Sequence, residues 1–216
     1  MIPKIYIDPG HSSVDPGAVG YEIERDLNEK VSQYMDEYLQ ANYVCETKVD
    51  PVENNSLRAV ADAANGWKAD LFVSNHFNAG GGDGWEGLVY NDSRVPLGKI
   101  FEKYVLQVGQ NSRGVKLRPD LAVLRQTDMP AILNEGAFVD NQKDIADWNE
   151  DKELEKLAMA YAKATAEALG LEAPAAPAGK IYRVQVGAYK EKANAEKMRE
   201  KLAKAGFEGI LVAADK

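Results

Sequence analysis

Short runs of β-branched and aromatic residues alternate, over the first 170 residues, with longer segments whose apolar side chains recur every three or four positions. The short runs predict strands, and the longer segments predict amphipathic helices. The predicted strands cover residues 4–7, 43–49, 71–77, 85–90, 121–124 and 131–136. The predicted helices cover residues 25–41, 55–67, 94–111 and 151–169. This alternation predicts an α/β fold with a mixed, largely parallel twisted sheet that is flanked by helices.

The composition changes after residue 170. Residues 171–179 read "LEAPAAPAG", and a segment so rich in alanine and proline is typical of a semi-stiff linker. Residues 180–216 then predict a small C-terminal βαβ unit, which is too small to close a hydrophobic core alone. We therefore expect one domain over residues 1–170, a linker, and a separate unit over residues 180–216. The predicted elements of that unit are a strand (181–187), a helix (192–205) and a second strand (207–213).

The net charge of −8 is unevenly distributed along the 216 residues. Residues 180–216 carry nine basic and five acidic side chains, whereas residues 1–179 carry 17 and 29. The two parts are expected to meet different partners, and we expect no nucleic acid among them. No apolar run approaches the roughly 18 to 20 residues of a membrane helix, so no membrane insertion is expected.

The chain opens with "MIPKIYIDPGH", which leads directly into the first predicted strand without a charged and then apolar leader. We expect it to be made in the cytoplasm without a signal peptide. Its single cysteine, Cys45, lies in a strand-like run and has no partner for a disulfide within the chain.

Both histidines of the chain lie at the ends of predicted strands: His11 comes after "IYIDPG", and His76 ends "LFVSNH". Functional groups collect at the carboxyl ends of strands in α/β sheets, so the two imidazoles could share one edge. Glu24 and Glu135 could join them, the first at a helix start and the second at a strand end. Each residue alone would be an ordinary surface side chain. Together they favour a metal site, because two histidines and a carboxylate form a common catalytic zinc set with one open position.

Four segments in the first 170 residues resemble motifs of the zinc-dependent N-acetylmuramoyl-L-alanine amidases found among bacterial cell-wall hydrolases (autolysins) and phage endolysins. The segments are "IDPGHSSVDPGAVG" (7–20), "ERDLN" (24–28), "SNHFNA" (74–79) and "ILNEGAFVDN" (132–141), and they occur in the family's order. The resemblance implies hydrolysis of the amide between N-acetylmuramic acid and L-alanine in peptidoglycan, which would lyse the cell wall.

Carried over to this chain, the resemblance implies one Zn²⁺ held by His11, Glu24 and His76, with Glu135 as the catalytic carboxylate. Glu22 is the alternative to Glu24, which is preferred because Arg-Asp-Leu-Asn follows it. Outside the ligand set, Asp8, Asn75 or backbone carbonyls could orient the imidazoles, or could be turn and capping groups.

The segment "GGGDGWEG" (80–87) joins the His76 strand to the next one. It could border a substrate cleft, with Trp85 as a substrate contact, or it could be a mobile connector.

The tail resembles the SPOR repeat through "VQVGAY", Asn-Ala and Ala-Gly-Phe. That family binds peptidoglycan glycan strands, and the matching positions Gln185 and Tyr189 are candidate wall contacts or ordinary sheet-face residues. A complete domain of the family has two βαβ halves, whereas this chain has one. Residues 180–216 are therefore expected to form a weak homodimer or to remain a truncated, unpaired half.

Two other functions fit the same residues. A metallocarboxypeptidase acting on stem peptides usually has a histidine and a glutamate three positions apart, whereas His11 and Glu24 are thirteen apart. The other alternative is a non-catalytic wall-binding protein whose metal site is inactive or structural. Glu135 beside an open zinc position argues against it, because a purely structural site is normally closed by four ligands. Lacking a leader, a wall hydrolase would reach its substrate through a phage holin or when a mother cell lyses.

Overall fold

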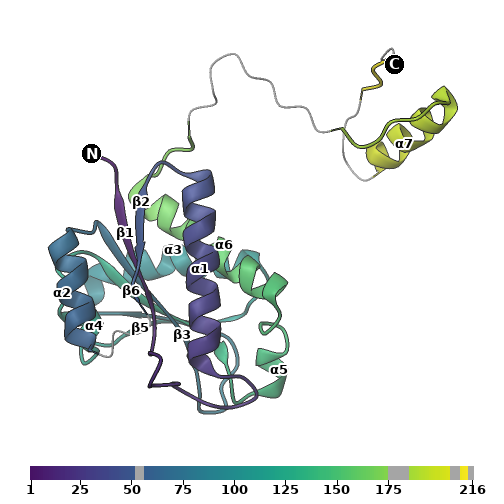
Figure 1. The fold of residues 1–216 in the computed structure, drawn as a ribbon. Helices are drawn as coiled ribbons and strands as arrows, with labels where there is room; N and C mark the ends of the chain where they lie inside the picture. Colours follow the sequence, from purple (N-terminus) through teal and green to yellow (C-terminus); the bar gives the residue numbers. More distant parts are fainter. Residues whose placement is uncertain (52–55, 175–184, 205–209, 214–216) are drawn as a thin grey trace. The chain divides into compact units, whose positions relative to one another are not determined.

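A computed structural model describes residues 1–51, 56–174, 185–204 and 210–213 (Figure 1). The chain divides into two units, Met1–Pro174 and Ala175–Lys216, which are treated separately below.

The first unit is built on one six-stranded sheet, in the order β2-β1-β3-β6-β4-β5 (Figure 1). Its strands are β1 (Lys4–Pro9), β2 (Glu46–Val49), β3 (Leu71–Asn78), β4 (Trp85–Val89), β5 (Ser112–Leu117) and β6 (Ala131–Phe138). All neighbouring strands are parallel except β4 and β6, which are antiparallel. The mixed, largely parallel sheet predicted from the sequence is confirmed.

Helices cover both faces of this sheet (Figure 1). One face is covered by α1 (Glu24–Asn42), α3 (Val95–Gln107) and α6 (Asp151–Leu169). The other face is covered by α2 (Leu57–Trp67) and the short α4 (Ala122–Arg125). The connections also contain the 3₁₀ turn η1 (Asp92–Arg94) and the short α5 (Gln142–Ile145).

Side-chain alternation along the strands divides the core between the two faces. In β1, Ile5 and Ile7 join the larger apolar cluster with α1, α3 and α6, whereas Tyr6 joins the smaller cluster with α2 and α4. The same alternation places Val73 of β3 in the larger cluster and Phe72 in the smaller one. Successive strand residues point to opposite faces, so both faces of these strands bury apolar side chains near the amino ends.

One predicted strand is wrong, and one strand was missed. Residues 121–124 were expected to form a strand, but Ala122–Arg125 is the helix α4, which buries Val123 and Leu124 in the smaller cluster. An apolar run this short carries no periodicity that separates a strand from one helical turn. The strand at this edge of the sheet is β5, which has the sequence "SRGVKL". This sequence is mostly polar and contains no apolar run that would predict a strand.

In the second unit, the described residues form one helix, α7 (Lys192–Lys204), as predicted. The described parts of the two predicted strands, residues 185–187 and 210–213, are not strands. Strand structure needs a hydrogen-bonded neighbour, and these residues have none within the described part of the unit. The rest of both predicted strands lies outside the described residues. Across the described ranges of both units, no helix has the length and apolar character of a membrane span.

Candidate metal centre and active site

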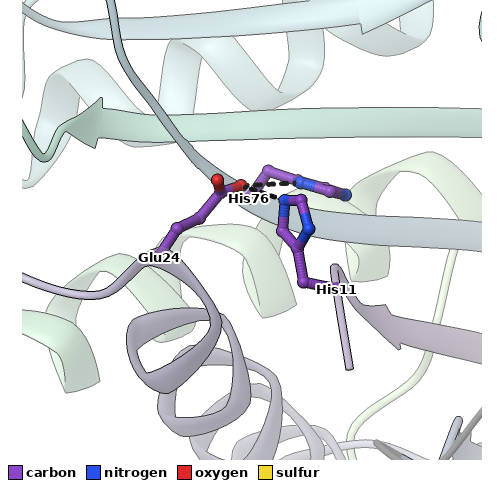
Figure 2. Close-up of side chains that lie close together, drawn as sticks. All are labelled: His11, Glu24 and His76. Carbon is purple, nitrogen blue, oxygen red and sulfur yellow. Dashed lines mark hydrogen bonds and ion pairs between the residues drawn. The ribbon is translucent and has the colours of Figure 1, made fainter. Parts of the chain in front are cut away.

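Three predicted residues meet at the carboxyl end of the sheet (Figure 2). His11 follows β1, Glu24 is the first residue of α1, and His76 belongs to β3. Glu24 Oε1 lies 3.0 Å from His11 Nε2 and 2.9 Å from His76 Nδ1. The two imidazole rings are 5.1 Å apart between centroids and lie edge to face at 72°. Each side chain therefore directs one potential ligand atom toward a shared point.

The backbone at His11 has a left-handed conformation, with φ of 71°. This region is uncommon for residues other than glycine and is often found at functional sites. Asp15 holds the ring from the other side, because its Oδ2 lies 3.0 Å from His11 Nδ1 while its Oδ1 accepts a hydrogen bond from Gly17 N. His11 Nε2 is thereby left to face Glu24. Sequence reasoning missed this role of Asp15, although its Asp-Pro-Gly triplet lies within the first quoted motif.

Two glycines leave the space that the cluster occupies. A Cβ atom on Gly10 would lie 2.1 Å from the His76 ring, and one on Gly17 would lie 2.5 Å from the His11 ring. Gly17 also has a φ of 67°, which side chains rarely tolerate. Any larger residue at either position would displace an imidazole.

Glu24 is buried and held by backbone donors as well as by the imidazoles. Ala18 N donates to its Oε2 at 2.8 Å, and Phe77 N donates to its Oε1 at 3.3 Å. Its place at the start of α1 also puts its negative charge at the positive end of the helix dipole. Burial alone would raise the pKa of Glu24, but the hydrogen bonds from His11 and His76 outweigh it and lower that pKa well below its usual range.

The same carboxylate makes the cluster a site for positive charge. Its hydrogen bond raises the pKa of His11 to about 9, and although burial opposes the charge on His76, Glu24 raises that pKa as well. Protonation of an imidazole is one source of such positive charge. A metal cation at the shared point would supply it instead, with both imidazoles neutral, as ligands must be. The donor set, the charge balance and the glycine cradle all fit a metal ion such as zinc.

Glu135 lies beside this cluster on β6, directly opposite His76 of β3 in the parallel register. Its Oε2 is buried and is without a hydrogen-bond partner in the described part of the chain. Burial raises the pKa of Glu135 to about 7, and the negative charges of Glu24 and Glu86 contribute to the shift. Glu135 is thus a carboxyl group poised to gain or lose a proton near neutral pH.

The alternatives considered around the site have other contacts. Glu22 accepts a hydrogen bond from Asn149 Nδ2 at 3.1 Å and is not part of the cluster. Asp8 accepts a hydrogen bond from Ser74 Oγ at 2.7 Å beneath the site. Asn75 points to the opposite face, where it donates to Ser32 Oγ of α1, so the expectation that it orients an imidazole is wrong. Neighbouring strand positions face opposite ways, and Asn75 precedes His76.

The expectation that Trp85 contacts the substrate is wrong. Trp85 is the first residue of β4, is 0% exposed and packs in the larger apolar cluster, so it cannot be a substrate contact. The glycine-rich loop before it is held by hydrogen bonds: Gly80 N and Gly81 N donate to Asp140 Oδ2, and Gly84 N donates to Asp144 Oδ2. Those anchors do not fit a mobile connector.

The candidate wall contacts in the second unit, Gln185 and Tyr189, are both exposed. Tyr189 is 40% exposed, and its ring lies against Gly187.

A family model described as N-acetylmuramoyl-L-alanine amidase matches residues 5–167. The chain belongs to this amidase family. A second model, described as SPOR domain, matches residues 151–213. The second match begins within the first, at the start of α6, and extends through α7.

Curated relatives in the amidase family match most of this chain. The sporulation-specific N-acetylmuramoyl-L-alanine amidase of Bacillus subtilis is 32% identical over 98% of this chain and 85% of its own length. The N-acetylmuramoyl-L-alanine amidase CwlM of Bacillus licheniformis is also 32% identical, over 98% of this chain and 85% of its own length. An endolysin of Bacillus phage SPP1 is 33% identical over 80% of this chain and 68% of its own length.

Solved structures of amidases share the fold of the first unit. The catalytic domain of CwlV, an amidase from Bacillus (Paenibacillus) polymyxa, has a TM-score of 0.74 and 26% identity, covering 79% of this chain and 100% of that one. An amidase from Clostridium difficile 630 has a TM-score of 0.73 and 26% identity, covering 78% and 97%. Membership of the amidase family favours the amidase prediction over the metallocarboxypeptidase and the non-catalytic wall-binding protein.

Proposed function

We propose that residues 1–170 form a zinc-dependent amidase that hydrolyses the bond between N-acetylmuramic acid and the L-alanine of peptidoglycan stem peptides. The observation that carries the proposal is the convergence of His11, Glu24 and His76 on one point, with Glu135 opposite His76 on the next strand. Three ligands leave a position open for reactants, unlike a closed structural site. When bound, zinc supplies the Lewis acidity that polarises the scissile carbonyl and makes water a competent nucleophile near neutral pH.

The residues around the ion have separate tasks. Asp15 and the left-handed backbone at His11 orient one imidazole, and Glu24 lies between both rings. Glu135 takes a proton from the attacking water as the oxygen bonds to the carbonyl carbon. It then delivers that proton to the nitrogen of L-alanine as the carbon–nitrogen bond breaks. Burial raises the pKa of Glu135 above that of an exposed carboxyl group, which favours uptake of this proton, because a general acid–base is most effective when its pKa lies near the working pH.

Removal of the metal tests this proposal directly. Exhaustive chelation should abolish the release of new L-alanine amino groups from purified cell walls, and added zinc should restore it. Elemental analysis should find one zinc per chain. Equal release of amino groups before and after complete metal removal would sink the proposal.

The C-terminal unit is proposed to bind the wall rather than to take part in hydrolysis, with residues 171–179 as its linker. The SPOR match over residues 151–213 and the exposure of Gln185 and Tyr189 support this division. Replacing both residues by alanine should reduce co-sedimentation with intact cell walls and leave turnover of a small soluble muropeptide unchanged. A fall in soluble turnover would contradict the division. The cell wall is accordingly the proposed place of action, and peptidoglycan the proposed partner of both parts.

A further inference from the structure

A row of polar side chains continues from the metal cluster across the sheet. His76 on β3 pairs with Glu135 on β6, and Glu135 pairs with Glu86 on β4. Directly opposed residues on adjacent strands project from the same face, so the three side chains form one line. The row ends at the edge strand β5, which contributes two cationic side chains, Arg113 and Lys116. Both contact Glu86.

The end of this row is built around a buried carboxylate. Glu86 is 6% exposed, and its Oε1 accepts hydrogen bonds from Arg113 Nε at 2.6 Å and Lys116 Nζ at 2.5 Å. The Arg113 guanidinium also lies over the ring of Phe138, 5.2 Å from its centroid. Both cationic side chains remain accessible, with 42% and 43% of their surfaces exposed. Two cations share the one carboxylate of Glu86, and their exposed surfaces are open to an additional anion.

The spacing of the row can be compared with the length of a peptide. Neighbouring strands lie about 4.8 Å apart, so β4, where the two cations converge, is about 10 Å from β3. About three residues of an extended peptide span that distance. An anionic group within the first three residues of a peptide that starts at the metal cluster would therefore reach the cations.

The opposite side of the cluster has a different character. The loop from His11 to Glu24 exposes three large apolar side chains, Val14, Val19 and Tyr21, and contains few charges. Apolar and aromatic groups suit the neutral faces of sugar rings. Glu135, the proposed donor to the leaving nitrogen, lies on the side of the cations. The stem peptide, which leaves as the amine, then belongs on the β4–β5 side and the glycan on the side of this loop.

We infer that Arg113 and Lys116, held in place by Glu86, form a subsite for a carboxylate within the first three residues of the leaving stem peptide. The inference rests on the proposed amidase function and adds a preference among its substrates: stem peptides with free carboxylates over those in which these groups are amidated.

Two N-acetylmuramoyl peptides of equal length test the subsite, one with free carboxylates on its second and third residues and one with carboxamides at both. The wild-type chain should cleave the carboxylate peptide with a kcat/KM about tenfold higher, because charge-assisted hydrogen bonds of this kind discriminate by about that factor. Arg113→Gln and Lys116→Gln, tested singly so that Glu86 keeps one cation, should each reduce this preference. Cleavage of the carboxamide peptide, which lacks the group that these cations would bind, should fall less than cleavage of the carboxylate peptide.

Lys103→Gln is the matched control, because Lys103 lies on α3, against the opposite face of the sheet, and pairs with Glu167. It should preserve the wild-type preference. Equal cleavage of both peptides by the wild-type chain would overturn the subsite and leave the amidase function intact. An equal fall on both peptides in the Arg113 and Lys116 variants would also overturn it, since the cations would then only neutralise Glu86. Cleavage of neither peptide by the wild-type chain would overturn the amidase function, and the subsite with it.

Discussion

The two faces of the sheet are covered to different degrees. Three helices, α1, α3 and α6, close one face over the larger apolar cluster, which includes Leu39, Phe101 and Leu157. The other face has only α2 and the single turn α4, and its apolar cluster is smaller. Where that cover ends, near the carboxyl ends of β3 and β6 and the amino end of β4, the side chains change to His76, Glu135 and Glu86. The closed face therefore carries most of the stability, and the open face carries the chemistry.

This division depends on the strand register. Asn75 and His76 are neighbours in sequence, yet Asn75 bonds to Ser32 of α1 on the closed face, whereas His76 lies in the metal cluster. A slip of one residue would exchange them, because side chains alternate between faces. Substitutions on the two faces should accordingly separate loss of activity from loss of stability.

The largest effect is expected on the open face, from Glu135→Ala. It should lower turnover by about two to four orders of magnitude, the usual contribution of a general acid–base, while zinc content remains at one per chain. His76→Ala is the companion variant and should lose both zinc and activity, because it removes a proposed ligand. Elemental analysis and amino-group release on the same samples separate the two. Loss of zinc from Glu135→Ala would mean that the roles of Glu135 and Glu24 are exchanged.

The next effect is expected on the closed face, from Leu157→Ala. Leu157 is fully buried on α6 and contacts the space above Gly136 of β6. Its truncation should lower the free energy of unfolding by about 2 to 5 kcal/mol, as cavities in apolar cores do. Zinc binding and kcat at a temperature where the variant is folded should be unchanged. Denaturant titration measures the first quantity. A loss of zinc from the folded variant would show that the two faces are not independent.

A smaller effect is expected from Asp15→Asn, at the rim of the open face. Asp15 orients His11 through its Nδ1 without joining the cluster, and loss of such a partner usually weakens metal affinity by about 10- to 100-fold. Competition with a zinc chelator measures the affinity. Asp62→Asn on α2, which removes an exposed partner of Arg58, is the control and should leave the affinity as it is. Equal zinc affinities in the wild-type protein and in both variants would show that Asp15 has no role in zinc binding.

The smallest expected effect concerns the second unit, for which we predict weak self-association, whereas the first unit is expected to be monomeric. A lone βαβ unit would expose strand edges, and α7 places Met198 and Leu202 one turn apart on the same side. Two copies of residues 180–216 could complete one sheet around a two-fold axis, so we predict a weak homodimer through these residues. Sedimentation at tens of micromolar should show a concentration-dependent mass for the full chain and a monomer for a chain ending at Gly170. Identical monomeric masses would rule the dimer out.

Much of the site could be predicted from the sequence because its residues carry local signals. Both histidines lie at the ends of apolar strands, Glu24 lies at the start of an amphipathic helix, and Glu135 lies at the end of an apolar run. The ends of strands and the starts of helices can be recognised from a few neighbouring residues. Because the carboxyl ends of parallel strands lie at the same edge of a sheet, residues at those positions are expected to be close together. The resemblance to amidase motifs then distinguished Glu24 from Glu22, which spacing alone left open.

Trp85 and β5 show where local signals fail. A tryptophan after a glycine-rich loop looks accessible in the sequence, but as the first residue of a central strand it faces the closed side and is buried. The polar segment 112–117 looks like a loop, yet it is the sheet edge that pairs with β4.

By itself, the sequence determined the alternation of strands and helices, the class of the fold, and the residues able to bind a metal or move a proton. Only the tertiary structure decided that β6 lies between β3 and β4, and that β4 runs against it. That order brings Glu135 between His76 and Glu86, and it carries the row on to Arg113 and Lys116 of β5. The physical reason is that pairing between strands distant in sequence is set by hydrogen bonds and side-chain packing across the whole sheet, which no short stretch of the chain encodes.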